Sequence, residues 1–210
     1  MTSARTVDVA DALASLAPAG VRTGARLISP TDVAGLHDVE RAAVARAVDK
    51  RRNELASGRA LLRSLLGADV AIPVGPTRAP VLPDGVIGSL AHDREVAVAA
   101  VSSDPAVAAL GVDVEDDAAL SDGMARLILR PDEAGIDAHL AFCLKEAAYK
   151  AWSTLGGRLV DHHDARVSVA GDTFTAEMDG LLVVPGRFAH AGTRWLALAV
   201  VHQPPRLVAP

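Results

Sequence analysis

The segment GVDVEDD, residues 111–117, carries carboxylates at a spacing that can bind a metal ion. If the segment is a strand, Asp113 and Glu115 share one face, because successive side chains alternate between the two faces. Two carboxylates on one face repel each other unless a cation or a basic group lies between them. For this stretch alone, a solvated strand end is the simpler interpretation. The functional interpretation is a hard divalent ion such as Mg²⁺, which takes oxygen ligands and commonly shares them with substrate phosphates.

A second segment, FCLKEAAYKAW at residues 142–152, places three charged side chains on an apolar, alanine-rich helix. Glu146 and Lys150 are four residues apart and can form a surface ion pair worth only about 0.2–0.5 kcal/mol, which is the simplest interpretation of the helix alone. Together with the carboxylates of the first segment, however, Glu146 would supply a third carboxylate, flanked by Lys145 and Lys150. A site that combines carboxylates, a metal and lysines suits a substrate that bears phosphates.

Basic residues gather in a third segment, residues 38–66, which contains seven basic and four acidic residues. Arg51 and Arg59 each lie four residues from Leu55, so on a helix they border its apolar stripe on either side. A basic helix is commonly just solvated, but arginines beside an apolar seam suit an anion held against the protein. Gly58, between the two arginines, would allow a ligand to approach the backbone closely.

Hydrophobic periodicity and turn residues predict the elements that position these side chains. We expect a mobile start, a strand at residues 21–28 and a turn at Ser29-Pro30 that leads into a helix. Residues 38–66 are predicted to form one helix, with an apolar stripe of Val44, Val48, Leu55 and Leu62. The remaining predicted elements are a loop at 72–88, strands at 95–101 and 110–115, helices at 121–129 and 137–155, and a run of strands up to the end of the chain.

This order of elements predicts an α+β protein, built as one structural unit from two halves at residues 1–108 and 109–210. Each half has a long helix followed by strands, and each closes with a strand of small residues, VAVAAV in the first and LALAVV in the second. We therefore expect two pseudosymmetric halves with the active site in the cleft between them. The basic helix and its loop fall in the first half, and the carboxylate and lysine motifs fall in the second.

Composition narrows the class of protein. The 210 residues are 50% hydrophobic and 22% charged, a globular balance, and the formal net charge is −5. That charge and the scarcity of aromatic residues argue against a nucleic-acid-binding module that uses the basic helix. The single cysteine, Cys143, cannot form an internal disulfide, and we expect a buried, inert thiol. No segment is typical of a signal peptide or a membrane span, which predicts a soluble, cytoplasmic protein with no membrane partner.

Other candidate residues and motifs carry less weight. His162 and His163 precede Asp164, but adjacent strand residues point to opposite faces, so we do not expect the two imidazoles to converge. His139, near a predicted helix start, is weaker still. The chain contains no GxGxxG, GxxxxGK[ST], GxSxG or HExxH, which removes the main sequence arguments for the chemistries of those motifs.

Taken together, three blocks resemble the 4′-phosphopantetheinyl transferases of the type that activates enterobactin and surfactin synthetases. The blocks are RRNELASGRALLRSLLG with the following TRAPVLPDGVIGSLAH, then LGVDVED, and then FCLKEAAYKAW. Their order and approximate spacing are similar to the family over residues 50–152, about half of the chain. GVDVE followed by F-x-x-K-E-x-x-x-K is the specific part, whereas the basic block alone would be weak.

The resemblance implies transfer of the 4′-phosphopantetheine arm of coenzyme A to a serine of an apo acyl or peptidyl carrier protein, with release of adenosine 3′,5′-bisphosphate. It implies a site for Mg²⁺, with Mn²⁺ as an alternative, at Asp113, Glu115 and Glu146. Glu146 is the best candidate base, directly or through a water, and Lys150 would balance charge on the leaving diphosphate. The residues implied to bind coenzyme A are Arg51, Arg59, Arg78, Ser89, His92, Lys145 and Lys150.

Three departures from the family pattern qualify these expectations. Ala91 stands before the histidine where many relatives have Ser or Thr, and Arg78 stands where lysine is common. The interval from Asp113 to Lys145 is short, which implies a small carrier-docking segment at SDGMARLILRPDE. The alternative function is a non-catalytic protein of the same fold that binds coenzyme A or a nucleotide. Both halves in one chain favour a monomer.

Overall fold

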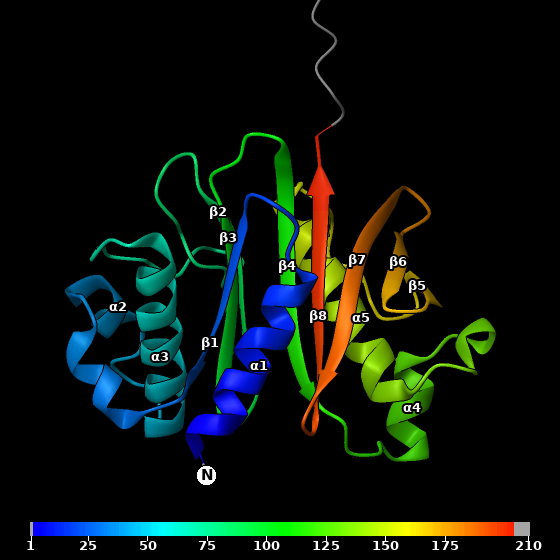
Figure 1. Cartoon of the computed structure of the whole chain (residues 1–210), viewed down its shortest axis with the longest axis horizontal. Helices are drawn as coiled ribbons and strands as arrows, with labels where there is room; N and C mark the ends of the chain where they lie inside the picture. The colour runs from blue at the N-terminus through cyan, green and yellow to red at the C-terminus, as the bar shows by residue number, and fades with distance from the viewer. Residues whose placement is uncertain (1, 204–210) are drawn as a thin grey trace, which may run out of the picture.

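Two antiparallel sheets form the centre of the protein (Figure 1). The computed structural model describes residues 2–203. The first sheet has the order β1-β3-β2, and the second has the order β4-β8-β7-β6-β5. The strands are β1 (Val21–Leu27), β2 (Ile87–His92), β3 (Val96–Ser102), β4 (Val107–Asp116), β5 (Ala165–Ala170), β6 (Thr173–Met178), β7 (Leu182–Ala191) and β8 (Arg194–His202). The chain is therefore α+β, as the sequence predicts.

Three long helices cover the sheets from opposite sides. Alternation along β3 sends Val96, Val98 and Ala100 into a core shared with α1 (Thr2–Leu16), whereas Ala97, Ala99 and Val101 pack against α3 (Asp49–Leu66). Strand β4 alternates in the same way: Leu110, Val112 and Val114 join the α1 core, and Ala109 packs against α5 (Ala138–Thr154). Helix α1 thus crosses in front of both sheets, with α3 and α5 on the other side (Figure 1).

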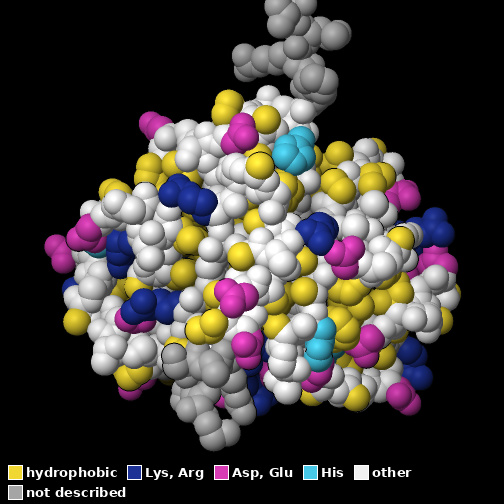
Figure 2. Space-filling view, viewed as in Figure 1, with side chains coloured by type: hydrophobic (Ala, Val, Ile, Leu, Met, Phe, Trp, Pro, Cys, Tyr) yellow, Lys and Arg dark blue, Asp and Glu magenta, His cyan; other side chains and the backbone are white. Residues whose placement is uncertain are grey.

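The expectation of a mobile start is wrong, because residues 2–16 form helix α1. Val9, Leu13 and Leu16 are buried in the core shared by the two sheets. The guanidinium of Arg187 on β7 donates to the carbonyl of Ser15 at 2.6 Å. On the face that carries α1, basic and acidic side chains are interspersed (Figure 2).

The single helix expected at residues 38–66 is instead two helices, α2 (Asp38–Ala43) and α3. Arg52 explains how the break is stabilised, since its guanidinium donates to the carbonyls of Val44 and Ala45, at 3.3 and 2.9 Å. Val48 is extended, precedes α3 and is 73% exposed, so it does not belong to the apolar stripe. Two 3₁₀ helices, η1 (Pro30–Gly35) and η2 (Pro131–Glu133), and α4 (Asp122–Ile128) complete the structure.

Two glycines set how closely the helices approach the strands. A Cβ on Gly111 of β4 would lie 1.8 Å from the carbonyl oxygen of Ala147, so α5 packs directly against the strand there. A Cβ on Gly58 of α3 would lie 2.7 Å from Leu90 of β2. Gly58 therefore serves helix packing, and the expectation that it admits a ligand is wrong. Across residues 2–203, no helix is long and apolar enough to cross a membrane.

The two sheets meet along β2 and β4, which lie side by side but belong to different sheets. Side-chain hydrogen bonds and ion pairs connect the two sheets at this seam. The amide of Val112 donates to Ser89 Oγ at 3.1 Å. Arg194 of β8 is buried and pairs with Asp93 and Glu95, which lie between β2 and β3.

Candidate active site

A pocket of about 510 Å³ opens over this seam and receives side chains from both sheets and from α3 and α5. Helix α3 contributes Arg51, Glu54, Leu55 and Arg59, and β2 contributes its residues from Gly88 to His92. The other wall comes from β4 and α5, with Asp113, Glu146, Tyr149 and Lys150 among its residues. The loop that contains Arg78 closes a third side. Segments far apart in the sequence thus place arginines opposite carboxylates and a lysine.

Asp113 and Lys150 form the central ion pair of the pocket. Lys150 Nζ donates to Asp113 Oδ1 at 2.5 Å and to the carbonyl of Val112 at 3.0 Å. Burial raises the pKa of Asp113, although Lys150 opposes this shift. Burial alone would lower the pKa of Lys150, but attraction to Asp113 and Glu146 outweighs it, and the pKa is raised. Lys150 therefore remains an ammonium at neutral pH, held at the carboxylate by the close approach of α5 to β4.

Glu115 and Glu146 bring two further carboxylates near Asp113. Burial, together with the charges of Asp113, Glu146 and Asp93, raises the pKa of Glu115 to about 7, although Lys150 opposes this shift. Glu146 lines the pocket, whereas Glu115 lies outside it, two residues after Asp113 on β4. Asp113 and Glu146 thus lie close enough to disfavour the ionisation of Glu115, an electrostatic cost that an added cation would reduce.

The donors in this region suit a hard divalent cation. Asp113 Oδ2 is buried and has no hydrogen-bond partner among the described residues. No group of three or more His, Cys, Asp or Glu side chains within residues 2–203 is arranged to hold a metal ion. The carboxylates of Asp113, Glu115 and Glu146 are therefore neighbours but not a preassembled ligand set, and the ammonium of Lys150 lies where it neutralises one of them. The unpaired Asp113 Oδ2 and the neighbouring carboxylate oxygens fit Mg²⁺, which takes oxygen ligands.

The basic side of the pocket is organised around Glu54. Arg51 Nη1 lies 3.3 Å from Glu54 Oε2 and 3.2 Å from His92 Nε2. His92 Nε2 lies 3.5 Å from the same carboxylate oxygen, and Lys50 approaches the other at 3.9 Å. The sequence prediction did not include Glu54, although its place three residues after Arg51 makes it a neighbour on the same helix. This carboxylate holds Arg51 and His92 together at the pocket wall.

Arg59 is almost fully buried and also contacts the loop that follows α3. Its Nε donates to the carbonyl of Ile72 at 2.6 Å, and its Nη2 lies 3.3 Å from the carbonyl of Pro73. Burial lowers the pKa of Arg59 to about 10, so the guanidinium stays charged at neutral pH. The same loop then forms a tight turn at Gly75 to Arg78, closed by the Arg78 amide and the Gly75 carbonyl at 2.9 Å. Arg78 has a φ of 68° and lines the pocket.

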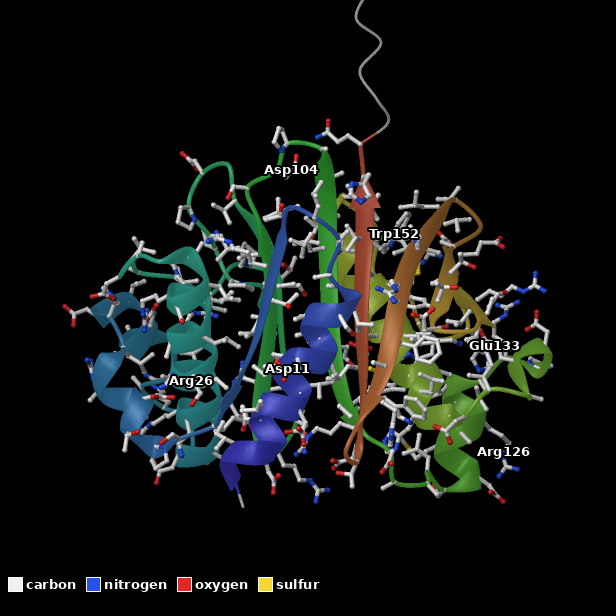
Figure 3. The ribbon with its side chains drawn as sticks, in the orientation of Figure 1. Asp11, Arg26, Asp104, Arg126, Glu133 and Trp152 are labelled. Carbon is white, nitrogen blue, oxygen red and sulfur yellow. The ribbon has the colours of Figure 1, made fainter. Side chains whose placement is uncertain are left out.

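Lys145 does not line the pocket, contrary to its expected contact with coenzyme A. Its ammonium donates to Glu133 Oε2 at 2.6 Å and to the carbonyls of Ile128 and His162, at 2.7 and 2.8 Å. Both charged side chains are only 1% exposed. Figure 3 shows Glu133 on the side of α5 that faces away from α3. Burial lowers the pKa of Lys145, although the ion pair with Glu133 opposes this shift.

Glu133 was missed by the sequence prediction, and it has a structural role. Its Oε1 accepts from the amide of Val167 at 2.6 Å, and its Oε2 accepts from the amide of Arg130 at 2.9 Å. The Lys145–Glu133 pair therefore ties α4, η2 and β5 to α5. In the sequence, Glu133 follows Pro131 at a helix start, a position where an acidic residue is an ordinary cap. That pattern gives no indication of a long-range partner.

His162, His163 and Cys143 do not line the pocket and make contacts elsewhere in the fold. His162 and His163 lie in a turn before β5 rather than on a strand. The ring of His162 packs 5.2 Å from that of Phe142, and His163 Nε2 lies 3.1 Å from the carbonyl of Arg126. Cys143 is fully buried, as expected, and burial raises the pKa of its thiol.

Comparisons with known proteins identify the family of this chain. Residues 39–102 match the family model of the 4′-phosphopantetheinyl transferase N-terminal domain. The chain is 39% identical to the 4′-phosphopantetheinyl transferase Svp of Streptomyces mobaraensis over 75% of this chain and 70% of that protein. It is 31% identical to the 4′-phosphopantetheinyl transferase Npt of Nocardia iowensis over 87% of this chain and 93% of that protein. It is also 34% identical to the 4′-phosphopantetheinyl transferase PptT of Mycobacterium tuberculosis, over 62% of this chain and 63% of that protein. The chain therefore belongs to the 4′-phosphopantetheinyl transferase family and is a transferase enzyme.

Proposed function

We propose that the protein transfers the 4′-phosphopantetheine arm of coenzyme A to a serine hydroxyl of an apo acyl or peptidyl carrier protein, in a Mg²⁺-dependent reaction that releases adenosine 3′,5′-bisphosphate. The observation that carries this proposal is the pocket over the seam, where Arg51, Arg59 and His92 face Asp113, Glu146 and Lys150. Such a pocket offers cations to a ligand with several phosphates and carboxylates to the metal that accompanies it.

The basic wall would bind the nucleotide phosphates of coenzyme A. Arg51 and His92 are held together by Glu54, which limits their mobility before the ligand arrives. Arg59 contributes a charge that burial leaves unscreened by solvent. Arg78 would reach the ligand from the strained turn at the pocket edge. Together these four side chains favour a polyanion over a neutral ligand.

The opposite wall would hold the divalent ion and the reacting groups. Asp113, Glu115 and Glu146 would ligate Mg²⁺, or Mn²⁺ in its place. When bound, the ion neutralises charge on the diphosphate and so favours attack at phosphorus. Lys150 would balance charge on the leaving bisphosphate, a role that its contacts with Asp113 and the carbonyl of Val112 support.

Glu146 is the proposed base for the acceptor serine. The serine oxygen forms a bond to the β-phosphorus as the bond from that phosphorus to the bridging oxygen breaks, and the serine proton passes to Glu146 directly or through a water. The adenosine bisphosphate leaves with the electron pair of the broken bond. We further propose that the two halves of one chain form the cleft, so that a monomer is sufficient; residues from both sheets in the pocket wall support this.

Intact-protein mass spectrometry tests the proposal. An apo acyl or peptidyl carrier protein is incubated with the enzyme, coenzyme A and Mg²⁺, and a gain of one phosphopantetheine mass is expected, which EDTA abolishes. Glu146→Gln is expected to lose transfer and to keep coenzyme A binding by calorimetry. Binding of coenzyme A without transfer to any of several carrier types would refute catalysis and leave a non-catalytic binding protein.

A further inference from the structure

Ser89 lies beside the amide of Val112 on β4, which no strand of the same sheet accepts as a hydrogen-bond donor. On β4, the edge away from β8 faces β2, which belongs to the other sheet. Val112 is fully buried, so its amide cannot turn to water. Ser89 Oγ accepts from this amide at 3.1 Å, and Ser89 itself is only 5% exposed. The serine hydroxyl thus replaces the hydrogen bond that a neighbouring strand would normally supply.

The residue whose amide bonds to Ser89 makes a second hydrogen bond through its carbonyl. The carbonyl of Val112 accepts from Lys150 Nζ at 3.0 Å, and the same ammonium donates to Asp113 Oδ1 at 2.5 Å. Val112 is therefore bonded to β2 through its amide and to α5 through its carbonyl. Since Asp113 follows Val112 directly, these two bonds fix the backbone from which its carboxylate projects. The second oxygen of that carboxylate is the buried one without a partner.

We propose that Ser89 is a positioning residue, which acts through Val112 to orient Asp113 for the divalent ion and does not itself determine the affinity for coenzyme A. This inference rests on the proposed function and revises the role in coenzyme A binding that the family resemblance implies for Ser89. Partners that orient a metal-binding carboxylate commonly alter metal affinity when they are removed, even though they do not touch the metal.

The test compares three substitutions of Ser89 with a matched control. Ser89→Ala removes the acceptor, Ser89→Cys keeps the volume with a much weaker acceptor, and Ser89→Thr keeps the hydroxyl. Ser102→Ala is the control, because Ser102 is a buried serine on the neighbouring strand β3 that also accepts from a backbone amide, that of Asp104 at 3.1 Å. Ser102 is not among the residues that line the pocket.

Metal binding is measured by titrating Mn²⁺ into the enzyme with coenzyme A present, followed by electron paramagnetic resonance. We expect Ser89→Ala and Ser89→Cys to weaken Mn²⁺ binding on the order of 10-fold, while Ser89→Thr and Ser102→Ala stay near wild type. Coenzyme A affinity in EDTA, by calorimetry, is expected to change less than about twofold in all four variants, an effect smaller than the loss of one hydrogen bond. Hydrogen exchange at the Val112 amide is expected to rise in Ser89→Ala and Ser89→Cys, and to stay near the wild-type rate in Ser89→Thr and Ser102→Ala.

Two results would overturn the inference. If Ser89→Ala weakens coenzyme A binding in EDTA tenfold with Mn²⁺ affinity preserved, Ser89 is a direct ligand of coenzyme A. If Ser102→Ala weakens Mn²⁺ binding as much as Ser89→Ala does, the effect is a general loosening of the sheet. Failure of the wild-type enzyme to transfer or to bind coenzyme A would instead refute the proposed function, so the two failures are distinguishable.

Discussion

Replacing Lys145 by methionine would show whether this lysine supports the fold or binds the ligand. Lys145 and Glu133 are each only 1% exposed, and the ammonium donates to one carboxylate oxygen and two backbone carbonyls. Lys145→Met leaves all three acceptors without their donor. Loss of one partner of a buried ion pair typically costs about 3–5 kcal/mol. Glu133 keeps two backbone amides as donors, so we expect a value near the lower end, about 3 kcal/mol.

Urea unfolding measures the stability of the Lys145→Met variant, and calorimetry measures its affinity for coenzyme A. Together they distinguish a structural role of Lys145 from a role in ligand binding. A loss of about 3 kcal/mol should lower the melting temperature by about 6–12 °C in a protein of this size. The double variant Lys145→Met/Glu133→Leu should recover part of this loss, because no unpaired charge stays buried. Coenzyme A affinity should stay at the wild-type level in both, whereas Lys150→Met, the matched change inside the pocket, should weaken it. A Lys145→Met variant with wild-type stability and at least tenfold weaker coenzyme A binding would refute the structural role.

Three further predictions concern the glycine at the helix contact, the strained turn and an ion pair near α3. Gly111→Ala should lower both the melting temperature and turnover, since its Cβ would lie 1.8 Å from a carbonyl oxygen of α5; Gly123→Ala, where a Cβ has open space, should change neither. Arg78→Gly should stabilise the protein by up to about 1 kcal/mol in urea unfolding, because its positive φ disfavours a side chain, and calorimetry should show weaker coenzyme A binding. The hydrogen bonds from Arg26 lower the pKa of Asp32 below its unfolded value, so this pair stabilises the fold at neutral pH and loses its effect as the pH falls through the native pKa. The stability deficit of Asp32→Asn in urea should therefore shrink toward pH 3, and a deficit that does not depend on pH would contradict this.

Much of the fold could be predicted because its elements carry strong local signals. Helix α5 begins after Asp137, whose carboxylate accepts from the amide of Leu140 at 2.9 Å, and α3 ends at Gly67 with a φ of 69°. Helix α1 was missed because its buried residues, Val9, Leu13 and Leu16, are spaced among alanines and polar residues, so its apolar stripe is narrow. Its stability comes from the junction of two sheets, a tertiary feature that no local pattern reveals.

The candidate site was predictable in composition but only partly in geometry. Seven of the predicted site residues line the pocket besides Ser89: Arg51, Arg59, Arg78, His92, Asp113, Glu146 and Lys150. Lys145 lies outside it, and helix geometry explains why the two lysines could not act together. Lys145 and Lys150 are five residues apart, which places them about 140° apart around the axis, whereas Glu146 and Lys150 differ by only about 40°. A helix that presents Glu146 and Lys150 to a pocket must therefore turn Lys145 away from it.

The small residues around these charged groups also contribute to the site. Ala147, Ala148 and Ala151 are fully buried on the face of α5 that contacts the second sheet, and Gly111 lies opposite them on β4. This contact brings the helix backbone close enough for the Lys150 ammonium to reach both Val112 and Asp113. A larger side chain at this interface would move α5 outward and lengthen both bonds. The alanine-rich composition of FCLKEAAYKAW is therefore part of what positions the site, because the distance between helix and strand determines whether lysine and carboxylate meet.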